Sequence, residues 1–115
     1  MKIKLDNLDK LFSKFVRLRA GGICEYCGQN KVLQCSHFVG RRKRSVRFDP
    51  DNAAGLCFSC HMYLGENPHI HTDWFRKRLG SERFENLNIR SNIITKIDRD
   101  KIEADLKERI KLLEK

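Results

Sequence analysis

Four of the five cysteines form two CxxC pairs, Cys24 with Cys27 and Cys57 with Cys60, and 29 residues lie between the pairs. Two tight turns that each offer a pair of thiolates are typical of a tetrahedral zinc site. The protein would fill all four positions around the ion and leave none for water or substrate. We therefore expect a structural zinc ion that stabilises a small fold and does not catalyse a reaction.

Three polar residues lie near these cysteines, and a zinc staple alone does not require them. His37 ends a predicted strand, Asn52 precedes the second cysteine pair by five positions, and His61 directly follows that pair. A strand, a loop and a helix joined by zinc would bring the three side chains to one side of the molecule. An enzyme has a use for such a set, whereas a zinc-dependent DNA-binding knuckle has none.

The net charge of +9 is concentrated in one third of the chain. Residues 10–47 contain ten Lys or Arg and one acidic residue, Glu25. Such a field attracts a polyanion by releasing condensed counterions, so DNA is the expected partner and an ordinary solvated basic surface is the alternative. An anionic membrane is disfavoured because "GRRKRSVRF" has no amphipathic helical pattern. The cations expected to hold the DNA backbone without reading its sequence lie between His37 and Asn52: Arg41, Arg42, Lys43, Arg44 and Arg47.

Hydrophobic periodicity and turn residues predict a small α+β fold in a single domain, 1–115. A helix capped by Asp6 or Asn7 and stopped by Gly21-Gly22 fills most of 1–22, and the zinc-stapled core covers 23–66. Within that core we expect a strand over 31–38, a second extended piece over 45–49 and a short helix over 57–64 closed by Gly65. Segment 67–115 is predicted to be helical over 72–79, 81–88 and 98–115, with a solvated loop at 68–71.

The N-terminus lacks a secretory signal pattern and no apolar run is long enough for a bilayer span, so we expect an intracellular, cytoplasmic protein with reduced thiols.

Cys35, the unpaired cysteine, is predicted to be a small buried thiol, although it shares a strand face with His37 and could approach the same site. Trp74 and Phe75 are expected in the core. The last helix carries one apolar stripe, which would pack either on the domain or on a second copy in a homodimer.

The segment from Cys24 to His61 resembles the HNH endonucleases of the ββα-metal, treble-clef-like fold, in the subset with a four-cysteine zinc. The longer stretch "CSHFVGRRKRSVRFDPDNAAGLCFSCHMYLGENPHIHTDWFRKRLG" is similar to the phage NinG or Rap recombination nucleases, a likeness that reaches roughly from Cys24 to Leu87 and implies DNA recombination and branched, Holliday-type substrates. The resemblance implies that His37 is the general base and that His61 binds a catalytic Mg²⁺ or Mn²⁺. Asn52 would either complete the metal shell or hold the loop that orients His37.

One residue departs from the HNH pattern. Many of these enzymes have Asp or His immediately before the base, where it binds metal, but this chain has Ser36, whose hydroxyl is a much weaker ligand. The alternative candidates to complete the shell are Asp49, Asp51, His69 and His71. Two rival functions therefore stay open: a zinc-stapled DNA-binding module without catalysis, and a protein-interaction adaptor built on the same staple.

Overall fold

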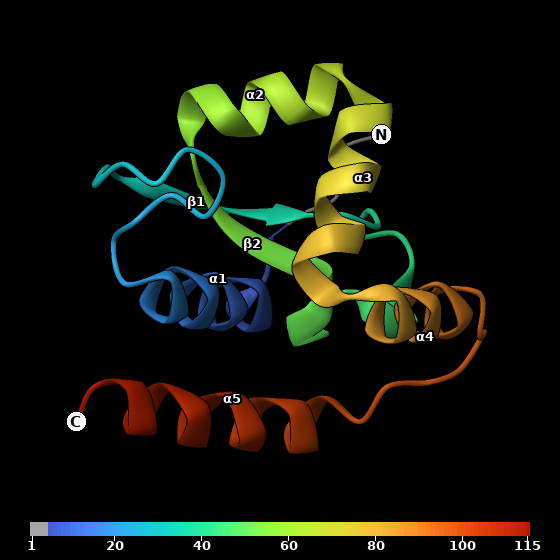
Figure 1. Cartoon of the computed structure of the whole chain (residues 1–115). Helices are drawn as coiled ribbons and strands as arrows, with labels where there is room; N and C mark the ends of the chain where they lie inside the picture. Colours follow the sequence, from blue (N-terminus) through green and yellow to red (C-terminus); the bar gives the residue numbers. More distant parts are fainter. Residues whose placement is uncertain (1–4) are drawn as a thin grey trace.

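The computed structural model describes residues 5–115 and confirms a small α+β fold (Figure 1). Within these residues five α-helices surround a two-stranded antiparallel sheet. The helices are α1 (Asn7–Ala20), α2 (Phe58–Glu66), α3 (Pro68–Leu79), α4 (Ser81–Ser91) and α5 (Arg99–Leu113). The strands are β1 (Leu33–His37) and β2 (Ala53–Cys57), and two short 3₁₀ helices, η1 (Arg44–Val46) and η2 (Pro50–Asn52), lie in the connection between them.

The sheet lies between α2 and α1, and α5 covers the far side of α1 (Figure 1). In the hairpin Leu33 pairs with Cys57 and His37 pairs with Ala53, so the end of β1 lies beside the start of β2. Helix α2 follows β2 without a loop. This order fixes His61 in the first turn of α2, one strand length away from His37.

The sheet divides the buried side chains into two clusters. One cluster lies among α2, α3 and α4 and is centred on Leu56, Leu64 and Phe75. The other lies between α1 and α5 and includes Phe12 and Leu106. The last helix therefore packs on the domain itself, which was one of the two alternatives expected for its apolar stripe.

Helix α1 has the predicted ends. Asp6 is its N-cap: its side chain accepts from the Asp9 backbone N–H at 3.0 Å, and Asp9 accepts from the Asp6 N–H at 2.9 Å in a capping box. Gly21 ends the helix with φ of 66°, a left-handed conformation that costs glycine little. The first four residues of the predicted segment 1–22 lie outside the described residues.

The second strand is not where the sequence pattern predicted it. Residues 45–49, expected to be extended, contain most of η1, whereas β2 spans 53–57. The alternation of Val46 and Phe48 resembled a strand, but Val46 is buried in the α2–α4 cluster and Phe48 in the α1–α5 cluster. β2 itself is "AAGLC", buried at every position and rich in small residues, and it therefore lacks both the alternation and the β-branched residues of a typical strand.

Two helix boundaries also differ from the prediction. α2 continues past Gly65 to Glu66. The segment 68–71, expected to be a solvated loop, is the first turn of α3, because Pro68 occupies a position where its fixed φ favours a helix start. Phe75 is fully buried in the core as predicted, whereas Trp74 is partly buried and packs against that core. None of the helices within residues 5–115 is both long enough and apolar enough to cross a membrane.

Candidate zinc site and histidine hollow

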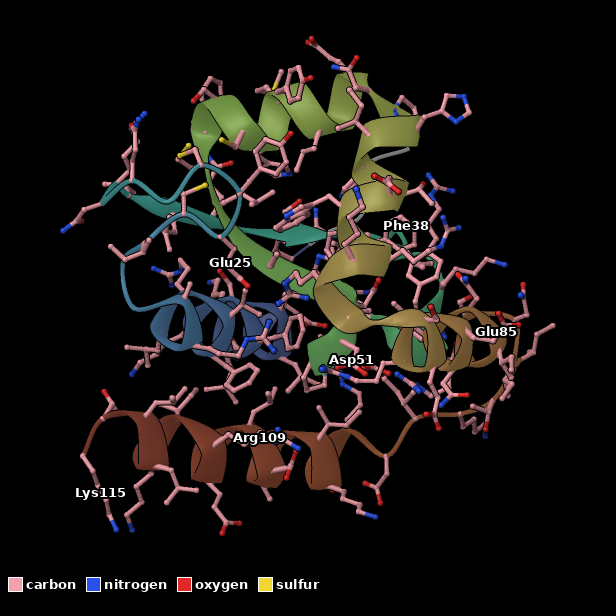
Figure 2. All side chains as sticks on the ribbon, viewed as in Figure 1. Glu25, Phe38, Asp51, Glu85, Arg109 and Lys115 are labelled. Carbon is pink, nitrogen blue, oxygen red and sulfur yellow. The ribbon has the colours of Figure 1, made fainter. Side chains whose placement is uncertain are left out.

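The four paired cysteines meet at one point, as their spacing predicted. The Sγ atoms of Cys24, Cys27, Cys57 and Cys60 all lie within 4.8 Å of one another, and those of Cys27 and Cys57 are 3.9 Å apart. Tetrahedral zinc with Zn–S bonds of about 2.3 Å separates its sulfur ligands by roughly 3.8 Å. Figure 2 shows the sulfur atoms gathered where β2 passes into α2. The cluster is therefore positioned to hold a structural metal such as zinc.

Local backbone geometry brings each cysteine pair into place. The first pair lies on a tight turn in which the Gly28 N–H donates to the Cys24 carbonyl at 2.9 Å, and Gly28 has φ of 75°. The second pair spans the first turn of α2, with Cys57 as its N-cap residue. The Cys57 backbone N–H donates to Cys24 Sγ at 3.3 Å. A helix N-terminus and backbone N–H groups both favour thiolate over thiol.

The thiol pKa values fit a site that needs a cation. The Ser59 hydroxyl and the Cys60 backbone N–H lower the pKa of Cys57 to about 6. Burial works against ionisation of Cys24, but hydrogen bonds from the Cys27 and Cys57 backbone lower its pKa. Burial and the neighbouring sulfurs raise the pKa of Cys60. A Cys60 thiolate beside the other sulfurs therefore needs a positive ion to compensate its charge.

A separate hollow of about 430 Å³ lies between α1 and the hairpin. We call it the histidine hollow, because both His37 and His61 line it. Its other lining residues are Leu5, Asp9, Lys10, Ser13, Arg17, Gln34, Cys35 and Arg41. Two of the three predicted catalytic residues thus share one cavity, with three cationic side chains around them.

His37 is held by the loop that follows its strand. Its Nε2 lies 2.9 Å from the Arg47 carbonyl oxygen, and because a carbonyl can only accept, Nε2 donates and Nδ1 keeps the lone pair. The Phe12 ring packs 5.5 Å from the imidazole, centroid to centroid. Burial lowers the pKa of His37 below its ordinary value. The imidazole is therefore neutral at neutral pH, as a general base must be.

His61 is oriented by a residue that the sequence analysis did not select. The Gln34 Oε1 atom lies 2.7 Å from His61 Nδ1, which leaves His61 Nε2 to act as a ligand. Metal-binding histidines are commonly oriented in this way through their second nitrogen. Burial, followed by the nearby Arg41 charge, lowers the pKa of His61 and favours its neutral form.

Asn52 does not line the histidine hollow and has no exposed surface. Its Oδ1 accepts from the Val39 N–H at 2.7 Å, and its Nδ2 donates to the Val39 and Val46 carbonyls at 2.8 and 2.9 Å. These bonds close the loop that also presents the Arg47 carbonyl to His37. The sequence left two roles open for Asn52. These hydrogen bonds match the role in which Asn52 holds the loop that orients His37.

Ser36 is 2% exposed and pairs with Ala54 in the sheet. Side chains alternate along a strand, so Ser36 points away from the face shared by Cys35 and His37. Cys35 lies in the hollow wall and also packs against the α1–α5 cluster, and burial raises the pKa of its thiol to about 12. Both descriptions of Cys35 offered by the sequence therefore apply: a largely buried thiol beside His37.

The alternative metal ligands lie elsewhere. Asp49 forms an ion pair with Arg90 at 2.7 Å, and Asp51 pairs with Arg83 and Arg90, so both carboxylates face α4. His69 is exposed at the start of α3. His71 is different: its Nε2 is buried and has no hydrogen-bond partner among residues 5–115.

The His71 ring packs against aromatic side chains. Phe38 and Phe75 pack edge-on against its ring at centroid distances of 5.4 and 5.2 Å, and Figure 2 shows Phe38 beside α3. Burial, with a smaller contribution from repulsion by His61, lowers the pKa of His71.

The predicted basic loop does not form a single surface. Arg41 lines the histidine hollow, whereas Arg42, Lys43 and Arg44 line another part of the molecule. Arg47 lies between these two surfaces. Its guanidinium binds both carboxylate oxygens of Asp9, which lines the histidine hollow, with Nε 2.9 Å from Oδ1. The opposite wall of the hollow is formed by three residues at helical spacing on α1, Lys10, Ser13 and Arg17. The sequence pattern counted Lys10 and Arg17 in the basic segment 10–47 but selected none of the three as a site residue.

Comparison with known proteins does not assign this chain to a family. No family model, no curated protein and no solved structure matches the chain.

Proposed function

We propose that this protein is a metal-dependent DNA endonuclease of the HNH type, with a structural zinc held by its four paired cysteines. The observation that carries the proposal is the placement of His37 and His61 in one hollow. Each imidazole commits one ring nitrogen to a hydrogen bond and keeps the other for chemistry. The cationic residues Lys10, Arg17 and Arg41 around them suit a phosphodiester.

In this proposal His37 Nδ1 takes a proton from water, and the resulting hydroxide attacks phosphorus. The bond from phosphorus to the 3′ oxygen breaks, and the departing oxygen takes a proton from water, which leaves a 5′-phosphate and a 3′-hydroxyl. Gln34 holds His61 so that Nε2 faces the phosphate, and Asn52 keeps the Arg47 carbonyl against His37. When bound at His61, Mg²⁺ or Mn²⁺ would stabilise the charge that develops on the phosphate oxygens.

The donor set of the hollow fits such an ion only loosely. Asp9 is the one carboxylate among the described residues that line the hollow, and both of its oxygens are bound to Arg47. The protein therefore offers His61 as its principal donor, and an ion at this position would keep most of its waters and bind the substrate phosphate directly. Tight binding of the free ion is not expected.

The test is cleavage of a supercoiled plasmid with Mg²⁺ or Mn²⁺. His37→Gln should reduce nicking by more than a hundredfold, because general-base catalysis contributes about 10²–10⁴ in rate. Zinc content, folding and DNA affinity should be unchanged in this variant. Exposed His69→Gln is the matched control and should cleave at the wild-type rate. Wild-type cleavage by His37→Gln would remove His37 as the base and with it the proposal.

A second candidate function is a zinc-stapled DNA-binding module without catalysis. The observations that favour it are the buried, inward-facing Ser36 and the absence of an unpaired carboxylate among the described residues of the hollow. Wild-type protein that binds DNA but nicks no plasmid with either ion would decide for this candidate.

A further inference from the structure

A second concave surface lies on the other side of the basic loop. Two hollows of about 420 and 540 Å³ share Arg44, Thr95 and Lys96 in their walls and so form one groove. One wall is the loop 42–47, and the other is residues 92–97 of the connector between α4 and α5 together with Arg99. We call it the connector groove.

The connector groove is strongly basic. Six of the described residues that line it are cationic, Arg42, Lys43, Arg44, Arg47, Lys96 and Arg99, and one is acidic, Asp6. Asp6 already pairs with Arg99 at 2.8 Å. Lys43, Arg44 and Lys96 are exposed and form no ion pair with any carboxylate of residues 5–115. This excess of positive charge is repulsive unless an anion occupies the groove.

The groove also has an apolar part. Ile93 is 50% exposed and Ile94 is fully exposed, and both line it next to Lys43 and Arg44. A small anion would make no favourable contact with these apolar side chains. The sugars and base edges of a nucleic acid would, since proteins that bind DNA grooves place isoleucine and similar side chains against them. The concave shape between two walls suits a strand better than a flat lipid surface.

The groove adjoins the histidine hollow but is separate from it. The Arg47–Asp9 ion pair stands between them: Asp9 lines the hollow, Arg47 lines the groove, and the Arg47 carbonyl holds His37. We infer that the connector groove is a second DNA-backbone site, which anchors DNA beyond the phosphate that lies at His37 and His61. Arg41 serves the hollow, and Arg42, Lys43, Arg44 and Lys96 serve the groove. The inference rests on DNA being the substrate of the proposed function.

Lys96→Gln tests the groove. Lys96 belongs to the connector and lies outside the basic segment 10–47, so its effect on DNA binding is specific to the groove. The assay is fluorescence anisotropy with a labelled DNA duplex, without added divalent ion, over a series of salt concentrations. We expect DNA affinity to fall by roughly threefold to tenfold and the salt slope to fall by about one, as for the loss of one phosphate contact. Arg44→Gln/Lys96→Gln should lose about two units of slope.

Lys111→Gln is the matched control. Lys111 is an exposed lysine on α5, twelve residues from Arg99, which is about 18 Å along the helix. It should change neither affinity nor salt slope. Circular dichroism should show that all three variants are folded.

Wild-type affinity and salt slope in Arg44→Gln/Lys96→Gln would overturn the inference. So would variants that bind duplex normally but lose affinity for phosphatidylserine vesicles, because the groove would then be a lipid site. The proposed nuclease function fails on a different result, normal plasmid nicking by His37→Gln, so the two failures are distinguishable.

Discussion

Asn52 has three side-chain hydrogen bonds, and all of them are made to backbone groups of the loop that connects β1 and β2. Because the residue has no exposed surface, water cannot replace any partner that a substitution removes. The loop carries the Arg47 carbonyl that fixes the tautomer of His37. At the scale of the residue, Asn52 therefore acts on His37 through the backbone.

Asn52→Ala should lower the free energy of unfolding by about 2–5 kcal/mol, because it removes the partner of the Val39 N–H and carbonyl and one of the two donors to the Val46 carbonyl. Urea denaturation measures this change. Asn67→Ala is the control: its side chain makes an exposed bond to the Tyr63 carbonyl, and its loss should cost less than about 1 kcal/mol. A normally stable Asn52→Ala protein with weaker Mn²⁺ binding would instead place Asn52 in the metal shell.

At the scale of the element, α2 connects the zinc site to the histidine hollow. Cys57 and Cys60 lie at its start, and His61 follows directly. Gly65, near the other end, has no steric reason to be glycine, since a Cβ placed there meets no atom within 4 Å. Glycine inside a helix is less favourable than alanine by up to about 1 kcal/mol.

Gly65→Ala should therefore raise the free energy of unfolding, by about 0.5 kcal/mol so close to the helix end. The contrasting variant is Gly55→Ala in β2, whose Cβ would lie 2.9 Å from Ala20 Cβ and 3.2 Å from Leu33 Cδ1. We expect that variant to lose about 1–3 kcal/mol, because α1 and β1 leave no room for a methyl group. Thermal unfolding of both variants shows whether each is more or less stable than the wild type. A Gly65→Ala protein that is less stable than the wild type would contradict the first of these two predictions.

The elements differ in how far the sequence predicts them. α1 and α5 are long amphipathic helices with aspartate caps, and these features are visible in a single sequence. β2 is short, made of small residues and buried on both faces, and only its tertiary neighbours make it a strand. The four-cysteine cluster was predictable from spacing, whereas the hollow was not, because Gln34 and Arg17 reach it from elements whose packing the sequence does not encode locally.

At the scale of the whole molecule, the cysteine cluster joins two parts of the chain that are about thirty residues apart. Loss of a metal from this cluster would free the turn at residues 24–28 from the start of α2. The α1–α5 cluster has no cysteine ligand and should keep its helices. Metal removal is therefore expected to loosen the sheet and α2 first.

Cys27→Ser should reduce bound zinc well below one ion per chain, lower the unfolding temperature and abolish plasmid cleavage, while much of the helical circular dichroism persists. Zinc content is measured by atomic emission. Cys35→Ser is the control, because Cys35 lies outside the four-sulfur cluster, and it should retain one zinc. Full zinc content in Cys27→Ser would contradict a four-thiolate site.

The position of α1 has a further consequence for anyone who wishes to transplant the histidine hollow. The stretch from Cys24 to His61 looks self-contained, since it holds the cysteines, both imidazoles and the arginine-rich loop. Grafted alone onto another scaffold, it would nevertheless lack Lys10, Ser13 and Arg17, which α1 contributes to the cavity around the imidazoles. It would also lack Asp9, the partner of Arg47. The smallest portable unit therefore begins at Asp6, upstream of every residue in the motif.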